Sequence, residues 1–293
     1  MSNKKKRLVI LLAVLAALVL LIGAELIRSN CALKVTGYAV RSEKVNSAFR
    51  VVLVSDLHGR EFGKNNRRLL EKIAANEPDV IVLAGDMIEA GADGEEIERV
   101  CAFVSAAKEI APVWYGLGNH EYRYIENHGA GLEEKLTEAG AVVLEAEYAD
   151  IDVGGTPVRI GGYAGYYRTA HLNTKDPEKQ AAHNSFFESF EDTERFKLLI
   201  NHIPTNWLDW DYRDKYPVDL VLSGHYHGGL VRFPLIGKGL YAPYVGWFPP
   251  YTKGCFEGEA ATCILSSGLA GANGVPRFFN TPEIVVIDVV PDN

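Results

Sequence analysis

The stretch Val51-Val52-Leu53-Val54-Ser55-Asp56-Leu57-His58 decides the fold, because a run of strand-forming residues ends there in two polar residues of ligand type. Such a run is typical of a buried strand that delivers a polar side chain to its carboxyl end, where open α/β sheets place their sites. Four further apolar runs end in the same kind of residue, at Asp86, Asn119, His202 and His225. The recurrence predicts a site assembled at the ends of five strands.

Length and composition indicate a globular protein. The chain has 293 residues, of which 47% are hydrophobic and 23% charged, enough to bury one large core. We see no repeat and no low-complexity tract, so solenoid and disordered classes lose their support. No domain boundary stands out after residue 32, and we expect two parts: an N-terminal segment of residues 1–30 and a domain of residues 31–293.

The N-terminal segment has the layout of a membrane anchor. The basic run Lys4-Lys5-Lys6-Arg7 precedes seventeen residues, 8–24, that lack charged and strongly polar groups. This length is at the lower edge of what crosses a bilayer. By the positive-inside rule we expect a single-pass transmembrane helix with a cytoplasmic N-terminus and an extracytoplasmic domain. A cleaved signal peptide, which would leave a secreted domain, has the same layout, but residues 22–24 match a cleavage site poorly.

The charge balance argues against nucleic acid as a partner. Without residues 1–7, which carry four of the 30 basic residues and no acid, 26 basic residues face 38 acidic ones, a net charge of −12. Phosphate backbones are held mainly by clusters of Lys and Arg. The four cysteines form no CxxC pair, which excludes zinc-finger chemistry. Cys255 and Cys263 are compatible with a small disulfide loop or with two free thiols.

Strands alternate with helices in the first half of the domain. Strands are expected near residues 33–40, 50–55 and 80–84 and from Pro112, with helices at 66–74 and 95–110 between them. This alternation predicts parallel βαβ units with right-handed crossovers as far as residue 120.

The pattern changes after Ala141 to closely spaced strands. Residues 142–144, 149–153 and 157–162, joined by turns such as Gly154-Gly155, suggest an antiparallel addition. Further strands are expected at residues 196–200, 220–222, 261–265 and 284–290. Two mixed sheets packed face to face, with helices outside, would use all of these elements.

The residues at the strand ends indicate a metal site. Asp56 and His58 are two residues apart, so on an extended segment both would reach one ion, and His225 and His227 repeat this spacing. Asp86 offers a bridging carboxylate, and Asn119 and His202 add an oxygen and an imidazole. Nitrogen and oxygen donors without thiolate suit Mn²⁺, Fe or Zn²⁺ rather than Ca²⁺, and seven ligands exceed one tetrahedral site. We therefore expect two divalent metal ions.

These blocks resemble the signature of the calcineurin-like metallophosphoesterase superfamily. In chain order they are Asp56-x-His58, Gly85-Asp86, Gly118-Asn119-His120-Glu121, His202 and Gly224-His225-x-His227, within residues 49–230. The resemblance implies a four-layer α/β sandwich. It assigns one metal to Asp56, His58 and His227, the other to Asn119, His202 and His225, and both to Asp86.

Features outside these blocks resemble the YkuE/YaeI-like membrane-associated phosphoesterases. They are the basic-apolar start, the block Asp86-Met87-Ile88-Glu89, the run 228–234 and the ending 267–284. This resemblance implies hydrolysis of phosphodiesters or pyrophosphates, including UDP-2,3-diacylglucosamine. Glu89-Ala90-Gly91 stands where phosphoprotein phosphatases carry an acidic-arginine pair, which argues against a protein phosphatase.

Roles beyond the metal ligands are also expected. His120, next to a ligand, is placed to protonate the leaving oxygen as general acid, the role that the resemblance also implies. Glu121 either orients His120 or faces solvent, and Arg60 is a candidate for contact with the substrate phosphate. The aromatic-rich loop 233–256 either accepts an acyl chain, rests in the membrane interface, or folds over the sheet edge.

The sequence thus predicts an anchored two-metal phosphoesterase whose substrate is a small-molecule or lipid-linked phosphodiester or pyrophosphate. Two alternatives stay open. One is a non-catalytic membrane-tethered module that binds a phosphorylated ligand at the metal site. The other is an extracellular nuclease with a basic patch formed by Arg60, Lys64, Arg67 and Arg68. No protein partner can be inferred.

Overall fold

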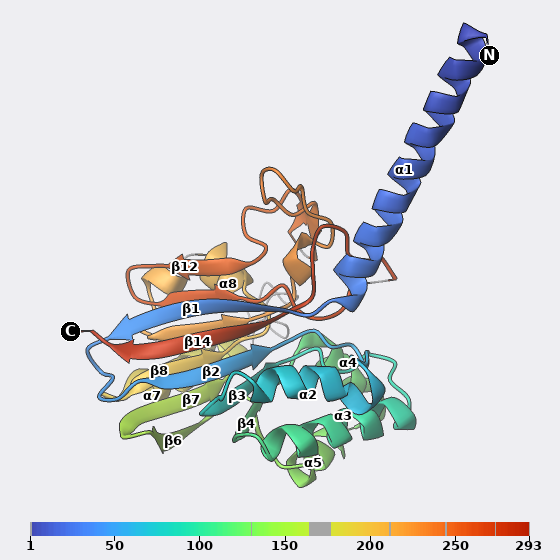
Figure 1. Cartoon of the computed structure of the whole chain (residues 1–293). Coiled ribbons are helices and arrows are strands. Elements are labelled where there is room, and N and C mark those ends of the chain that lie inside the picture. Colours follow the sequence, from blue (N-terminus) through green and yellow to red (C-terminus); the bar gives the residue numbers. More distant parts are fainter. Residues whose placement is uncertain are drawn as a thin grey trace.

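Two six-stranded sheets packed face to face form the centre of the protein (Figure 1). The computed structural model describes residues 2–129, 131–163, 177–210, 212–243, 245–272 and 274–292. The first sheet contains, in spatial order, β1 (Lys34–Ser42), β14 (Glu283–Pro291), β2 (Phe49–Val54), β3 (Val80–Ala84), β4 (Val113–Gly116) and β5 (Ala141–Leu144). The second contains β12 (Gly254–Glu257), β13 (Thr262–Leu265), β9 (Leu220–Ser223), β8 (Phe196–Ile200), β7 (Thr156–Gly162) and β6 (Glu147–Val153).

The remaining elements are helices and one short hairpin. The hairpin pairs β10 (Tyr241–Ala242) with β11 (Gly246–Trp247). The α-helices are α1 (Asn3–Cys31), α2 (Arg67–Ala74), α3 (Gly94–Lys108), α4 (Asn119–His128), α5 (Gly131–Glu138), α7 (Pro177–Glu191) and α8 (Thr205–Leu208). The 3₁₀ turns among the described residues are η1 (Lys64–Asn66), η2 (Tyr212–Asp214) and η3 (His227–Gly229).

The central strands are apolar on both faces because each face packs against another layer. In β2, Val51 and Leu53 enter the core between the two sheets, whereas Val52 and Val54 enter the core beneath the helices. This alternation follows from the two-residue repeat of a strand. Leu198 and Leu222 meet Leu53 from the second sheet in the same inter-sheet core.

Helices cover the outer faces and complete four layers. Residues of α2, α3 and α5 pack on the first sheet, where Leu69, Ile97 and Leu136 are buried, and Figure 1 shows these helices on one side of it. Phe190 of α7 and Trp207 of α8 pack against the second sheet. The predicted four-layer sandwich of two mixed sheets is confirmed.

The predicted pairing after Ala141 was only half right. Strands β6 and β7 form the antiparallel hairpin around Gly154-Gly155, as expected. Strand β5, however, belongs to the other sheet, where it pairs parallel with β4 and forms an edge. Leu136 of α5 and Ala141 enter the core under the first sheet. The chain therefore returns from β4 to the same sheet through a helical crossover, as parallel strands require, and not through a hairpin turn.

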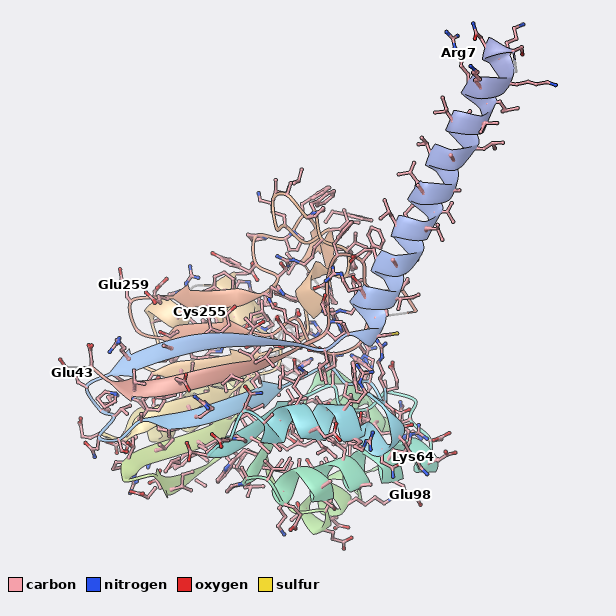
Figure 2. The ribbon with its side chains drawn as sticks, in the orientation of Figure 1. Arg7, Glu43, Lys64, Glu98, Cys255 and Glu259 are labelled. Atoms are coloured by element: carbon pink, nitrogen blue, oxygen red, sulfur yellow. The ribbon has the colours of Figure 1, made fainter. Side chains whose placement is uncertain are left out.

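Helix α1 stands away from the sandwich and joins it only at its last turns. An 18-residue window of α1 has a mean hydropathy of 2.9 and is 0% buried, so this helix is long and apolar enough to cross a membrane, as a signal sequence also can be. Figure 2 shows Arg7 near its free end, far from the sheets. At the other end Arg28 donates to the Thr281 hydroxyl at 2.7 Å, and Asn30 exchanges hydrogen bonds with the backbone of Arg277.

The predicted basic patch faces this helix end. Arg60 donates to the carbonyl of Asn30 and Arg68 to that of Cys31 at 3.2 Å, while Arg67 lies 3.5 Å from Glu71. Arg60 and Arg68 thereby hold the junction of α1 with the sandwich, whereas Arg67 pairs within α2. Two of the four residues of the predicted patch are thus engaged at this junction, which does not favour a nucleic-acid surface here.

Cys255 and Cys263 lie on opposite faces of the second sheet. In the β12–β13 pair, Cys255 is opposite Ile264 and Cys263 is opposite Phe256. Cys255 packs toward the inter-sheet core and Cys263 is buried on the outer face. Because side chains of neighbouring positions point to opposite faces, the two thiols cannot meet, and both are free.

Candidate metal centre

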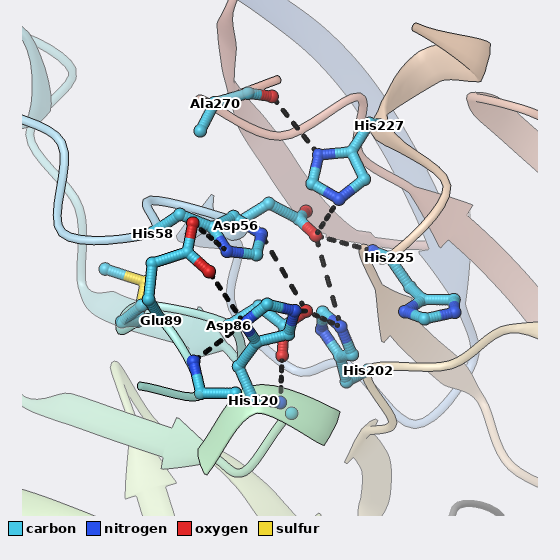
Figure 3. A network of polar contacts seen from close by, with 12 residues as sticks. Asp56, His58, Asp86, Glu89, His120, His202, His225, His227 and Ala270 are labelled. Atoms are coloured by element: carbon cyan, nitrogen blue, oxygen red, sulfur yellow. Dashed lines mark hydrogen bonds and ion pairs between the residues drawn. The ribbon is translucent and has the colours of Figure 1, made fainter. Parts of the chain in front are cut away.

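Five strands of the two sheets end at the same edge, as the sequence predicts. Strands β2, β3 and β4 are parallel neighbours in the first sheet, and β8 and β9 are parallel neighbours in the second. Their carboxyl ends carry the residues shown in Figure 3, where the side chains of Asp56, Asp86, His202, His225 and His227 converge. The chain thus brings together residues separated by up to 171 positions in sequence, from Asp56 to His227.

The segment after β2 is not extended, contrary to expectation. Asp56 and His58 have φ angles of 53° and 48°, and Asp86 after β3 has a φ of 52°. Left-handed conformations are uncommon for residues other than glycine and cost energy unless the surroundings impose them. Here the loops after β2 and β3 continue the pairing of these two strands, since the N–H of Asp56 donates to the carbonyl of Gly85 and the N–H of His58 to the carbonyl of Asp86, each at 3.0 Å.

The first group of possible ligands is Asp56, His58 and His227. Ligand atoms of the three lie within 4.8 Å of one another. Nε2 of His227 is 3.7 Å from Oδ1 of Asp56, and the rings of His58 and His227 are 5.1 Å apart. This spacing leaves room for one cation between the three side chains.

The second group is Asp86, His202 and His225, whose ligand atoms also lie within 4.8 Å. Nε2 of His202 is 3.1 Å from Oδ2 of Asp86. The spacing of His225 and His227 suggested that both could reach one ion, whereas the family resemblance assigned them to different ions. They fall in different groups, because the segment is not extended: His225 has a φ of 74° and His227, where η3 begins, a φ of 47°.

Asp86 lies between the two groups. Its Oδ2 is 3.1 Å from Nε2 of His202 in the second group and 3.8 Å from Nε2 of His58 in the first. Its Oδ1 accepts the N–H of His120 at 2.8 Å, which fixes the carboxylate. A carboxylate held in this way has one oxygen facing both groups.

Asn119 begins helix α4 directly after β4 and lies in the same pocket. Its side chain is 5% exposed, and its Oδ1 makes no hydrogen bond with the described residues. The preceding Gly118 is required by space, since a Cβ there would overlap Oδ1 of Asp86. Gly224 before His225 is equally constrained, because its Cβ would lie 2.5 Å from Oδ2 of Asp56.

Backbone groups orient the ligand rings. Nδ1 of His202 is 2.6 Å from the carbonyl of Ala84, and Nδ1 of His227 is 3.2 Å from the carbonyl of Ala270. A carbonyl partner keeps the ring proton on Nδ1 and leaves Nε2 as the donor atom for a metal. Both Nε2 atoms are the ones that face the carboxylates.

Burial and charge act in opposite directions on these histidines. Burial opposes the charged form of His202, but Asp86 outweighs it and raises the pKa to about 9. For His58, burial is outweighed by Glu89 and Asp86, and its pKa also rises to about 9. Burial prevails at His227, whose pKa falls to about 4, and at His225, whose pKa is lowered.

Asp86 remains ionised in this environment. Burial works against its charge, but His202 and then His58 lower its pKa well below the usual value. The site therefore combines buried carboxylates with closely packed imidazoles.

Glu89 is a site residue that the sequence analysis missed. Its two oxygens lie 3.4 Å from Nδ1 of His58 and 3.0 Å from Nδ1 of His120. The hydrogen bond with His120, followed by that with His58, lowers the pKa of Glu89. Ligand atoms of His58, Glu89 and His120 also lie within 4.8 Å of one another. Since Glu89 is half exposed and faces the Nδ1 atoms, we interpret it as a partner of the ligand ring rather than a ligand.

His120 lines the pocket with Nε2 directed inward. Nε2 is 4.0 Å from Oδ2 of Asp86, and Nδ1 accepts the N–H of Ala90 at 3.0 Å. In a neutral ring that accepts this N–H at Nδ1 the proton is on Nε2, and a ring that is protonated on both nitrogens also carries one there. In both states a donor points into the pocket.

Neither expectation for Glu121 holds. The residue is 0% exposed, so it does not face solvent, and its hydrogen bonds with the described residues go to groups other than His120. Its oxygens accept hydrogen bonds from the N–H groups of Asp86, Met87, Ile88 and Gly118 and from the hydroxyl of Tyr115. Glu121 thereby ties the loop that carries Asp86 to the end of β4.

Arg60 lies outside the pocket, and Arg123 lies in it. The guanidinium of Arg60 contacts the carbonyl of Asn30 and stacks on Phe62 at 5.1 Å. The pocket, of about 270 Å³, is lined by Arg123 of α4 together with most of the metal-site residues, Asp56 and His202 excepted, and with Tyr241, Pro243 and Ala272. Arg123 carried no sequence signal beyond its place one helical turn after Asn119.

The residues present fit divalent cations. Oδ2 of Asp56, Oδ1 of Asn119 and Nε2 of His58 are buried and make no hydrogen bond with any described residue. A buried polar atom without a partner costs about 1–3 kcal/mol, so several in one pocket indicate a ligand that pairs with them. Carboxylate, amide and imidazole donors without thiolate suit Mn²⁺, Fe or Zn²⁺.

Comparison with known proteins gives the same reading of the chain. Residues 49–229 match the family model of the calcineurin-like phosphoesterases. The chain is 25% identical to an uncharacterized metallophosphoesterase of Campylobacter jejuni, over 97% of this chain and 70% of that one. It is 24% identical to YkuE of Bacillus subtilis, covering 84% and 80%, and 26% identical to the phosphodiesterase YaeI of Escherichia coli, covering 84% of each.

The extent of these matches differs between relatives. The chain spans 70%, 63%, 62% and 62% of the length of the first four relatives, which come from Campylobacter, Bacillus and two strains of Helicobacter. Among solved structures, the phosphopantetheinyl hydrolase of Mycobacterium tuberculosis superposes with a TM-score of 0.46 at 14% identity, covering 75% of this chain and 89% of that one. The chain belongs to the calcineurin-like phosphoesterase family, and YkuE and YaeI are among its relatives.

Proposed function

We propose that this hydrolase uses two divalent metal ions to cleave a phosphodiester or pyrophosphate bond of a small-molecule or lipid-linked substrate. The observation that carries the proposal is the position of Asp86, whose Oδ2 faces His202 of one ligand group and His58 of the other. Asp56, His58 and His227 would hold one ion, Asn119, His202 and His225 the other, and Asp86 both. The donor set supports Mn²⁺, Fe or Zn²⁺ as occupants.

Two such ions would supply an activated water and stabilise the charge of an in-line displacement. In its doubly protonated form, with Glu89 paired at Nδ1, His120 would donate the Nε2 proton to the leaving oxygen and remain as a neutral ring, because Nε2 faces the pocket. Glu89 holds the other side of the ring at Nδ1. Arg123 at the pocket wall presents a guanidinium, which pairs with a phosphate through two parallel hydrogen bonds.

Helix α1 supports attachment to a membrane with the site outside the cytoplasm. Its basic end, Lys4 to Arg7, favours the cytoplasmic side, and only residues 32–33 separate α1 from β1. Protease treatment of intact spheroplasts that express the full chain tests this orientation. The proposal predicts digestion of the sandwich from outside, and protection until lysis would contradict it.

Turnover by the purified full chain in detergent tests the catalytic proposal. With Mn²⁺ added, the chain should hydrolyse bis-p-nitrophenyl phosphate, and Asp86→Asn should lower the rate at least about 10³-fold, because the bridging charge provides several kcal/mol of stabilisation. Asp192→Asn, an exposed aspartate outside the pocket, is the matched control and should leave the rate unchanged. Equal rates for the two variants would refute the proposal.

A further inference from the structure

Five large apolar side chains project from the loop between η3 and β12. Phe233, Leu235, Ile236, Trp247 and Phe248 are 38%, 98%, 66%, 68% and 62% exposed. We call these five residues the apolar tip. Contiguous apolar surface of this kind normally serves an interaction, whereas single exposed apolar residues need no explanation.

The apolar tip is held in shape by hydrogen bonds and ring contacts. Gly237 N–H donates to Phe233 at 2.8 Å, closing the turn that exposes Leu235 and Ile236. Phe248 N–H donates to Leu240 at 2.9 Å, and the rings of Phe233 and Phe248 stack at 6.2 Å. Phe248 has a φ of 54°, which is rare for an aromatic residue. The local fold thus keeps these side chains outside rather than letting them collapse onto the sheets.

The same hairpin forms a wall of the metal pocket. Tyr241 of β10 and Pro243 line the pocket. Trp247 of β11 pairs with Tyr241 across the hairpin, and their rings are 5.5 Å apart. Directly opposite residues share one face of a hairpin, so this face runs from Tyr241 at the pocket to the 68% exposed Trp247, and the apolar tip borders the pocket.

The base of the apolar tip is joined to the foot of α1. Arg232 N–H donates to Phe278 at 2.9 Å, and Asn280 Nδ2 donates to Leu230 at 3.1 Å. The same Asn280 donates its N–H to the hydroxyl of Ser29 in α1 at 3.2 Å. The direction of α1 and that of the tip are thus fixed relative to each other, and Figure 1 shows both rising from the same side of the sandwich.

We propose that the apolar tip inserts into the interfacial layer of the bilayer that α1 crosses, so that the metal pocket opens at the membrane surface and receives the headgroup phosphoester of a bilayer lipid. This inference rests on the proposed function. Trp and Phe suit the interfacial layer, and the exposed Lys238 in the same turn suits anionic headgroups. The exposed apolar stretch of α1 identifies a bilayer as the neighbour on this side.

Quenching of Trp247 by labelled lipids tests the insertion. The full chain carrying Trp210→Phe is incorporated into vesicles of equal parts phosphatidylcholine and phosphatidylglycerol. In this variant Trp247 is the exposed tryptophan, and the other two, Trp114 and Trp207, are buried. Lipids with a quencher near the headgroup should quench its emission, and a further Trp247→Phe change should abolish that quenching. A chain that floats with the vesicles but is not quenched would overturn the inference, as would cross-links through the tip between two copies.

A pair of substrates tests the consequence for catalysis. Methyl p-nitrophenyl phosphate is soluble, and hexadecyl p-nitrophenyl phosphate resides in the vesicle, but both release the same group. Leu235→Ser with Ile236→Ser should lower turnover of the hexadecyl diester by about tenfold or more, given the transfer free energy of two aliphatic side chains, and leave the methyl diester unchanged. Val142→Ser, an exposed apolar position on edge strand β5, is the control.

The two proposals fail in different ways. If neither substrate is cleaved while Trp247 is still quenched, the catalytic proposal fails and the membrane contact stands. If both diesters are cleaved and the Leu235→Ser, Ile236→Ser variant changes the turnover of both by the same factor, the membrane contact fails and the catalytic proposal stands.

Discussion

Oε2 of Glu89 lies 3.0 Å from Nδ1 of His120, while the other oxygen of the same carboxylate lies 3.4 Å from Nδ1 of His58. One carboxylate thus positions both the proposed general acid and a proposed metal ligand. The pKa of Glu89 is lowered by the hydrogen bond with His120 and then by that with His58, so it is ionised at neutral pH.

Replacement of Glu89 should therefore impair chemistry without unfolding the chain. We expect Glu89→Gln to lower kcat or metal affinity about 10–100-fold, the usual cost of losing a carboxylate behind a ligand histidine. Glu89→Asp, which keeps the carboxylate, should lose less activity or metal affinity than Glu89→Gln. Glu98→Gln, at an exposed position of α3, should have no effect. Steady-state kinetics with metal titration checks this, and wild-type values for Glu89→Gln would contradict the assigned role.

His120 should matter most when the leaving oxygen needs a proton. Its N–H contact to Asp86 at 2.8 Å is a backbone contact and survives substitution. We expect His120→Asn to lower kcat about 10²–10⁴-fold for a diester with an alkyl leaving group, and much less for p-nitrophenolate, which leaves unprotonated. Metal content should stay at the wild-type value. His128→Asn at the other end of α4 is the control, and equal losses with both leaving groups would exclude a general acid.

Glu121 should be a stabilising residue. A glutamine at this position would turn an N–H group toward the N–H groups that now donate to the carboxylate, from Asp86, Met87 and Gly118. We expect Glu121→Gln to lower the free energy of unfolding by about 2–4 kcal/mol, and metal affinity to fall with it because the Asp86 loop loosens. Urea unfolding in detergent checks this against Glu126→Gln, an exposed residue of the same helix, and the prediction fails if the two variants are equally stable.

Glu283 should give the fold an acid-sensitive component. Burial raises its pKa, but Lys253, 3.1 Å away, and hydrogen bonds from Thr36 and Ser267 outweigh burial and lower the pKa below 4.5. A folded pKa below the unfolded value means that the stabilisation is present above the unfolded pKa and is lost as the pH falls through the folded pKa.

Glu283→Gln should therefore destabilise the chain by about 1–3 kcal/mol at pH 7 and by less at pH 4. Unfolding curves at both values of pH, compared with those of the exposed Glu257→Gln, measure this difference. A deficit that is the same at both pH values would show that the ionised form of Glu283 does not contribute.

The strands that carry the site could be predicted because their signal is local. Residues 196–200 and 80–84 are fully apolar apart from Lys197, and the structure forms β8 and β3 over those same residues. Helix α3 was expected at 95–110 and spans Gly94–Lys108. The convergence at one edge also followed, because parallel strands end on the same side of a sheet.

Other features depend on tertiary structure and had no local signal. The pairing of β5 with β4 is decided by the packing of α5, not by the four residues of β5. The left-handed turns at Asp56 and His58 are imposed by pairing with the loop after β3, which their residue types do not reveal. Glu89 ends the block Asp86-Met87-Ile88-Glu89, but only its contacts with His58 and His120 give it a role in the site.

The division into residues 1–30 and 31–293 remains a prediction. Helix α1 ends at Cys31, and its residues from Arg28 to Asn30 form hydrogen bonds with residues 277–281, so the anchor and the sandwich share an interface. The boundary in the sequence reflects the end of the apolar stretch rather than the end of the helix.

Anomalous diffraction at the manganese edge, from crystals of the full chain grown with Mn²⁺, tests the central claim most directly. The account predicts two peaks about 3.5–4 Å apart, on either side of the Asp86 carboxylate. One peak should lie among Asp56, His58 and His227, and the other among Asn119, His202 and His225. A single peak, or peaks away from Asp86, would contradict a two-metal hydrolase.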